Sequence, residues 1–216
     1  MKTFISSCFA LLLALLASSC HHVEDIIHPH PPGNKHPSFH TDKTNIVTSF
    51  LANQQGDPPT DSAELLFENR KMNPLTAPDG HQLNYGQFSA AHGTLTMNCV
   101  PGGSKVTVRM KNLIPYGLYT FWVAILNASG DVVALGASGG SDGQYSFAVA
   151  DSDGSVTYSQ VVPEGPLSVR GKADECLLDE HEVHIVGAYH LDGRTYGGEL
   201  GPAGTVAQQF FFAYQQ

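Results

Sequence analysis

Charged residues, and basic residues above all, are scarce in this chain. Only 14% of its 216 residues are Asp, Glu, Lys or Arg, and 11 Lys and Arg stand against 20 Asp and Glu, for a formal net charge of −9. A nucleic-acid-binding surface needs a basic face to neutralise phosphates, and the sequence has no basic cluster. No apolar run reaches the roughly 18 residues of a membrane-spanning helix. The composition therefore argues against nucleic acid as a partner and against a transmembrane helix.

Long helical patterns are also lacking, and turn residues take their place. The chain holds 22 Gly and 13 Pro, and no sustained helical period follows Leu75. Apolar and polar residues alternate instead, as around Val106, Val108 and Met110. Asp-Gly pairs at 142–143, 153–154 and 192–193 separate such runs, and Asp-Gly is a common hairpin turn. The pattern predicts an all-β fold, a single antiparallel β-sandwich of about eight or nine strands, Ig-like or jelly-roll-like.

Several runs make this prediction more specific. Residues 118–126 are apolar on both parities, which indicates a central strand that is covered on both faces. Two other runs place their apolar residues on one side, which we expect to be buried: Tyr145, Phe147 and Val149 in one, and Val206, Phe210, Phe212 and Tyr214 in the other. Residues 63–72 are compatible with either a first strand or a short helix.

The N-terminus has the pattern of an export signal. Lys2 supplies a positive charge, residues 9–17 are apolar, and small residues precede Cys20. This resembles the lipobox of bacterial lipoproteins, in which the cysteine becomes the first mature residue and carries acyl chains such as palmitate. The family prefers Leu three places before the cysteine, where Ala17 stands here. We expect residues 1–19 to be a lipoprotein signal peptide and Cys20 to anchor the protein in the bacterial cell envelope, at the outer membrane. The alternative is plain secretion.

A His- and Pro-rich segment follows the expected anchor. Prolines at 29, 31, 32 and 37 disfavour helix and central strand, so we expect residues 20–45 to be a disordered tether, 46–63 a linker, and 64–216 the sandwich domain. Neutral imidazole is a good ligand for Zn, Cu or Ni, so the tether could collect ions, or it could be a plain polar spacer. Six of the 11 histidines lie here: His21, His22, His28, His30, His36 and His40.

Cysteine usage fits an exported protein. Of four Cys, Cys8 leaves with the signal and Cys20 is the expected lipidation site. Cys99 and Cys176 remain as an even pair in an oxidising compartment, which predicts a disulfide between them. The alternative is two separate buried thiols.

The densest group of potential metal ligands lies at residues 179–190. Glu182 and His184, two apart on a predicted strand, lie about 6–7 Å apart on one face. His190 lies roughly 20 Å further along, unless Gly187 marks a sharp bulge. The alternative is a partly exposed polar strand face, with Val183, Ile185, Tyr189 and Leu191 turned to the core. The candidate ligands for a Zn or Cu ion are Glu182, His184, His190 and His81 in the sandwich and His21, His22, His28 and His30 in the tether.

No catalytic residue stands out. Residues 136–140 match the G-x-S-x-G nucleophile pattern around Ser138, but the helix that presents such a serine is not predicted to follow. No spacing selects a pair of acidic residues for glycoside hydrolysis. Trp122, Tyr116, Tyr189 and Tyr196 either line a groove for a sugar or peptide or belong to the core and its rim. A binding role is therefore favoured over an enzymatic one.

Three separated motifs carry a resemblance to a family. Residues 77–82 (APDGHQ), 117–123 (GLYTFWV) and 187–193 (GAYHLDG) resemble a group of uncharacterised secreted bacterial proteins over about residues 64–216. The resemblance implies a single exported β-rich domain and carries no known activity. In that group a His often occupies the place of Tyr196.

We therefore expect a lipid-anchored envelope protein with a binding or scaffolding role. Its expected partners are the membrane, through the anchor, and an unknown protein or glycan. The alternative function is metal binding by the tether and the Glu182–His184 strand face, and otherwise no cofactor is expected.

Overall fold

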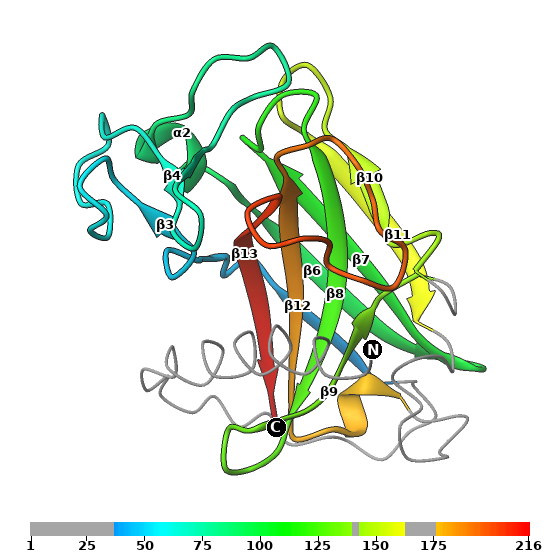
Figure 1. Ribbon diagram of the computed structural model, residues 1–216. Helices are drawn as coiled ribbons and strands as arrows, with labels where there is room; N and C mark the ends of the chain where they lie inside the picture. The colour runs from blue at the N-terminus through cyan, green and yellow to red at the C-terminus, as the bar shows by residue number, and fades with distance from the viewer. Residues whose placement is uncertain (1–36, 140–142, 163–175) are drawn as a thin grey trace, which may run out of the picture.

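The computed structural model describes residues 37–139, 143–162 and 176–216, which form a β-sandwich (Figure 1). One sheet has the order β1-β6-β7-β11 and the other β10-β8-β12-β13-β2, with β9 also paired to β8, and every pairing is antiparallel. In Figure 1, β8, β12 and β13 lie in front of β6 and β7. The predicted all-β sandwich is confirmed.

The strands of the first sheet are β1 (Ser38–Thr41), β6 (His92–Val100), β7 (Gly103–Lys111) and β11 (Val156–Val162). Those of the second are β2 (Asn45–Ile46), β8 (Leu118–Leu126), β9 (Val132–Ala137), β10 (Phe147–Val149), β12 (Glu182–His190) and β13 (Val206–Gln215). A small third sheet holds β3 (Leu51–Ala52), β4 (Phe67–Glu68) and β5 (Asn73–Pro74). Two short helical elements complete the described fold, α2 (Tyr85–Ser89) and the 3-10 turn η2 (Leu177–Asp179).

The main core lies between the two large sheets. On β7, Val106, Val108 and Met110 are fully buried while Lys105 and Arg109 are exposed, as the alternation predicts. Strand β8 is buried on both sides, because Tyr119 and Phe121 join the main core and Trp122 joins a second apolar cluster on the outer face of its sheet. The predicted central strand is confirmed.

A β-bulge in β13 changes which residues face the core. Gly187 of β12 lies opposite Phe210, but the next residue, Ala188, lies opposite Gln208, so Gln209 is an extra residue in β13. Phe210 and Phe212 therefore enter the main core, whereas Val206 packs with Trp122 on the outer face. The prediction that Val206 shares a face with Phe210 is wrong, because the extra residue inverts the alternation.

The bulge turns Gln209 into the interior, where it links three elements. Its amide nitrogen donates to the Phe88 carbonyl of α2 at 2.6 Å, and its oxygen accepts from the Tyr119 hydroxyl at 2.7 Å. The Tyr119 oxygen in turn accepts from the Ile114 amide at 2.9 Å. A fully buried side chain with every polar end paired stabilises the junction of α2, β8 and β13.

The folded part begins earlier than the sequence predicts. Strand β1 lies within the residues expected to be tether, β2 spans the boundary between the expected tether and linker, and β3 lies in the expected linker. β1 pairs with β6, and Phe39 packs its ring against Tyr214 at 4.9 Å, so backbone pairing and an aromatic contact both join this polar segment to the sandwich. Within residues 63–72, the strand β4 forms instead of a helix. Residues 20–36 lie outside the described part.

The disulfide between Cys99 and Cys176 is present, with a Cα–Cα distance of 5.2 Å, which confirms the predicted pairing. It joins the end of β6 to the segment before η2. Among the described residues, no helix has the length and apolarity to cross a membrane.

Candidate functional site

The outer face of the second sheet carries the polar side chains of β12. Residues 182, 184, 186, 188 and 190 face away from the main core, while Val183, Ile185 and Tyr189 lie in it, as predicted. Glu182, His184 and His190 are only 5%, 2% and 1% exposed. The expectation of a partly exposed polar face is therefore wrong, and these side chains must find partners inside the protein.

Glu182 and His184 form a buried pair at the start of β12. His184 Nε2 lies 2.6 Å from Glu182 Oε1, and the Gln215 amide donates to Glu182 Oε2 at 2.9 Å. The hydrogen bond from His184 holds the pKa of Glu182 below its usual range, against the desolvation that raises it. The His184 ring stacks on Phe211 at 4.8 Å, and its Nδ1 is buried without a partner.

His190 has a different environment at the other end of the same strand. Its Nε2 lies 2.8 Å from the Thr120 hydroxyl, which also accepts the Trp122 indole N–H at 2.9 Å. Burial lowers the pKa of His190, with nearby Asp192 opposing the shift, so the ring is held neutral. Tyr196 stacks over His190 at 6.2 Å and donates its hydroxyl hydrogen to Asp192. The His190 Nδ1 also lacks a partner.

The candidate metal ligands are therefore only partly brought together. Glu182 and His184 are in contact, but His190 lies six residues beyond His184, roughly 20 Å along the strand. The sequence allowed for a sharp bulge at Gly187, but the extra residue lies in β13, so β12 runs on without the bend that would bring His190 closer. His81 bonds Asp79 at 2.6 Å and lies near Gln87. In the described ranges no three His, Cys, Asp or Glu side chains are placed to hold one ion. His21, His22, His28 and His30 lie outside those ranges.

Ser138 is built into the core. It is fully buried, donates its hydroxyl hydrogen to the Phe121 carbonyl at 2.9 Å, and lies 2.7 Å from the Tyr158 hydroxyl. Burial raises the pKa of Tyr158 to about 12, so this partner is a neutral donor and no base for Ser138. The geometry gives Ser138 a structural role.

Four exposed apolar side chains form what we call the aromatic ridge: Tyr116, Tyr145, Phe147 and Val149. They are 64%, 57%, 45% and 55% exposed, respectively. The prediction that residues 145, 147 and 149 face the core is wrong, although residues 147–149 do form a strand. Buried Ser146 and Ala150 and half-buried Ala148 turn inward instead, because their small side chains fit where β10 lies close to the core.

Tyr116 holds an unusual backbone conformation. It is the third residue of the turn 114–117, in which the Gly117 amide bonds the Ile114 carbonyl at 2.9 Å. Its φ is 58°, in the region where glycine or asparagine is usual and a bulky residue is strained. The turn therefore presents a tyrosine ring to solvent at a cost to stability, which is a pattern typical of functional positions. The sequence names Tyr116 as a groove candidate, but it gives no sign of the strain.

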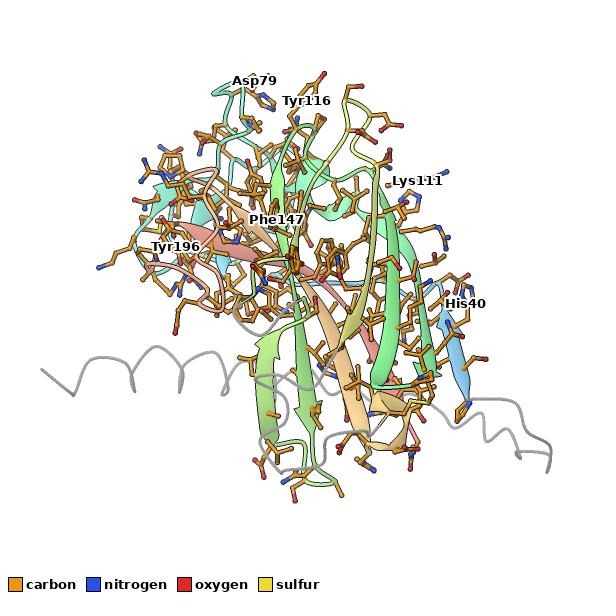
Figure 2. All side chains as sticks on the ribbon, turned by 90° about the vertical axis from the view of Figure 1, so that its right-hand side faces the viewer. His40, Asp79, Lys111, Tyr116, Phe147 and Tyr196 are labelled. Atoms are coloured by element: carbon orange, nitrogen blue, oxygen red, sulfur yellow. A yellow bond between two sulfur atoms is a disulfide. The ribbon has the colours of Figure 1, made fainter. Side chains whose placement is uncertain are left out.

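The ridge lies beside the His190 end of the outer face. Phe147 pairs with Thr120, whose hydroxyl contacts His190. The loop between β12 and β13 crosses the outer face of β8 in Figure 1, and its Gly197 backbone lies against Gly143, just before the ridge. In Figure 2, Tyr116 lies at the upper end of the molecule, with Phe147 and Tyr196 below it.

Comparisons with known proteins place few constraints on this chain. No family model matches it, and no curated protein matches it. Among solved structures it is similar to a Cu/Zn superoxide dismutase from Brucella abortus, with 16% identity and a TM-score of 0.37 over 82% of this chain and 97% of that one.

Proposed function

We propose that this protein is a lipid-anchored protein of the bacterial cell envelope that binds a protein partner through the aromatic ridge. The conformation of Tyr116 carries the proposal. A tyrosine at φ 58° that is 64% exposed is strained and gains little from packing within the described fold. Contact with a partner would bury the exposed ring, and the free energy gained by this burial would offset the backbone strain.

The chemistry of the ridge favours a polypeptide partner. Tyrosine and phenylalanine are enriched at the energetically dominant positions of protein interfaces, where a rigid ring buries much area at low entropic cost. Strand β10 carries no charged residue, and Phe147 and Val149 are exposed on it. A polypeptide partner could therefore pack its apolar side chains on Phe147 and Val149.

The anchor rests on the signal-like segment and Cys20, with residues 21–36 as the spacer between the membrane and the sandwich. A Cys20→Ala variant is expected to move from the membrane fraction to the soluble fraction and to lose labelling with a palmitate analogue. A variant that still sediments with membranes would contradict the anchor without bearing on the ridge.

The ridge is tested by site-specific cross-linking followed by binding measurements. A photo-reactive phenylalanine analogue at position 147 is expected to trap one partner in cells, whereas the same analogue at Met72, which is 38% exposed outside the ridge, does not. The purified partner should then bind the Tyr116→Ala/Phe147→Ala variant at least ~10-fold more weakly than the parent protein.

The matched control for these variants is Leu65→Ala, because Leu65 is 46% exposed and lies away from the ridge. It should bind the partner like the parent protein. Equal cross-linking from positions 72 and 147, or unchanged affinity of the double variant, would refute the role of the ridge.

A further inference from the structure

The first sheet differs from the rest of the chain in its charge. Its four strands, β1, β6, β7 and β11, contain no Asp or Glu, whereas the whole chain has 20 acidic residues and a formal net charge of −9. The same strands contain three cationic side chains, Lys105, Arg109 and Lys111, which are all exposed and all on β7. The first sheet is therefore a positively charged region of an acidic protein.

The outer side of this sheet presents these cations to solvent. The alternate residues of β7 are buried in the main core, so residues 105, 107, 109 and 111 face outward. In Figure 2, Lys111 of β7 and His40 of β1 lie along one side of the molecule, opposite the side of Tyr196. This surface is therefore distinct from the outer face of the second sheet.

Two of the three cations lack a partner. Among the described residues, the side chains of Lys105 and Arg109 have neither an ion pair nor a hydrogen bond. Lys111 differs because it lies near Asp153. Hydrogen bonds from Ser155 lower the pKa of Asp153, and the charge of Lys111 lowers it further. Lys105 and Arg109 therefore carry positive charge that no anion of the described fold compensates.

Hydroxyl groups lie between and beside these two cations. One row of hydroxyls crosses three strands between them: Thr96 of β6, Thr107 of β7 and Ser159 of β11. Thr107 Oγ1 lies 2.9 Å from Ser159 Oγ. In the neighbouring row, Thr94 and Thr157 lie on either side of Arg109. A hydroxyl both donates and accepts hydrogen bonds, so the surface offers neutral polar contacts around each charge. We define the basic face by six residues: Thr94, Thr96, Lys105, Thr107, Arg109 and Ser159.

The basic face has few apolar groups to offer a ligand. Of the aromatic residues on the four strands, Tyr158 is buried in the core and Phe39 packs against Tyr214. Val161 is the one large apolar side chain that is exposed on these strands. Single-stranded nucleic acids are usually bound by stacking on aromatic rings, and peripheral membrane helices bury apolar side chains in the lipid. Positive charge combined with hydroxyl groups instead matches a polymer that carries both anionic groups and hydroxyls.

We propose that the basic face binds an anionic polysaccharide, a chain of acidic sugars. Lys105 and Arg109 lie roughly 13 Å apart along β7, at about 3.3 Å per residue. One small anion would meet both only if both side chains lay across Thr107, whereas a chain of acidic sugars offers a separate carboxylate to each. Lys105 and Arg109 then donate charge-assisted hydrogen bonds to the carboxylates, and the row of hydroxyls between them bonds the sugar hydroxyls.

The charge of the whole protein restricts such a polymer to this face. The chain is acidic overall, so it repels a polyanion elsewhere, and the four strands without Asp or Glu are where the repulsion is absent. This site is separate from the aromatic ridge, and it depends neither on the lipid anchor nor on a protein partner.

The test uses the full chain, purified in a non-ionic detergent, and polygalacturonate, which carries one carboxylate per sugar. Titration calorimetry at low salt measures the affinity. We expect the parent protein to bind the polymer and to bind it more weakly as salt is added. The Lys105→Gln/Arg109→Gln variant should bind at least about 10-fold more weakly. Thr107→Val, which removes one hydroxyl and keeps the shape of the side chain, should weaken binding by about 3-fold.

The matched control variant is Lys71→Gln/Arg194→Gln, which removes two exposed cations outside the basic face. It changes the net charge by the same amount and should bind polygalacturonate like the parent protein. Thermal unfolding of each variant checks the fold. Two matched polymers complete the test. Methyl-esterified polygalacturonate keeps the sugar chain but loses the charge, and polyglutamate keeps the carboxylates but has no hydroxyls. Both should bind at least about 10-fold more weakly than polygalacturonate.

Three results would overturn the proposal. One is the absence of polygalacturonate binding to the parent protein. Another is equal affinity of the two double variants, which would show that overall charge and not this face controls binding. The last is polyglutamate that binds as tightly as polygalacturonate, which would assign the face to acidic polypeptides. None of these results bears on the anchor or on the aromatic ridge.

Discussion

Two histidines on one face of β12 illustrate how a single partner sets the chemistry of an imidazole. His184 and His190 are both buried, both bonded through Nε2, and both without a partner at Nδ1. The Glu182 carboxylate can only accept a hydrogen, so His184 carries a hydrogen on Nε2, and in the neutral ring Nδ1 carries a lone pair.

The partner of His190 acts in the opposite direction. The Thr120 hydroxyl already accepts the Trp122 N–H, so its own hydrogen is free to be donated to His190 Nε2. We therefore expect the ring hydrogen of neutral His190 on Nδ1. In the neutral rings the carboxylate therefore leaves a lone pair at Nδ1 of His184, whereas the hydroxyl leaves an N–H at Nδ1 of His190.

Removing the Thr120 hydroxyl should have the largest effect on this comparison. Thr120→Val keeps the shape of the side chain but leaves the Trp122 N–H and His190 Nε2 buried without partners. Each of these two unpaired groups costs about 1–3 kcal/mol, so we expect a loss of about 2–6 kcal/mol in the free energy of unfolding. Urea denaturation measures this value. A loss below about 0.5 kcal/mol would mean that the two groups are not desolvated.

The second largest effect that we expect is the contribution of His190 to the pH dependence of stability. The folded state lowers the pKa of His190, so the unfolded chain takes up a proton first as the pH falls below the ordinary value of about 6.5. Stability from this group is complete above pH 6.5 and declines below it. His190→Gln should remove that decline in urea denaturation between about pH 6.5 and 5. An unchanged pH profile would contradict the neutral, buried state of His190.

Glu182 should act in a lower pH range and with a smaller effect. Its pKa is lowered in the folded state, so its contribution is present above the ordinary value of about 4.3 and is lost as the pH falls through the folded value. Glu182→Gln should flatten the stability curve below about pH 4.3. Denaturant titrations of the parent protein and of the Glu182→Gln variant at matched pH values test this. Stability curves that fall in parallel in the acidic range would refute it.

The smallest expected effect is spectroscopic. ¹⁵N NMR of the imidazole rings should show the hydrogen on Nε2 in His184 and on Nδ1 in His190. This measurement locates the ring hydrogens and does not depend on a change in stability. The opposite pattern in either ring would show that its partner does not control the tautomer.

The sequence predicts where the two histidines lie on the strand, but it does not predict their hydrogen-bond partners. The alternation of residues 182–190 is enough to place His184 and His190 on one face, and residues 118–126 predict that β8 is covered on both sides. The partners come from other strands: Thr120 from β8 and Gln215 from β13. Strand register sets these contacts, and a bulge such as the one at Gln209 changes register without a sequence signal strong enough to predict it.

The same limit applies to the aromatic ridge. Alternation correctly predicts a strand around Phe147, but it assumes that the apolar side faces inward. Here Ser146, Ala148 and Ala150 face inward because of the space available beside β8, which only the tertiary structure defines. The disulfide could be predicted because an exported chain leaves Cys99 and Cys176 as the two remaining cysteines.

The position of the disulfide has a mechanical consequence. Tension applied at Pro37 acts on a residue whose carbonyl accepts the Cys99 amide. Cys99 is covalently joined to Cys176, so the force passes directly into two distant parts of the chain. Peeling of β1 from β6 would therefore begin beside a covalent crosslink, which keeps the rest of the sandwich joined while the first strand yields.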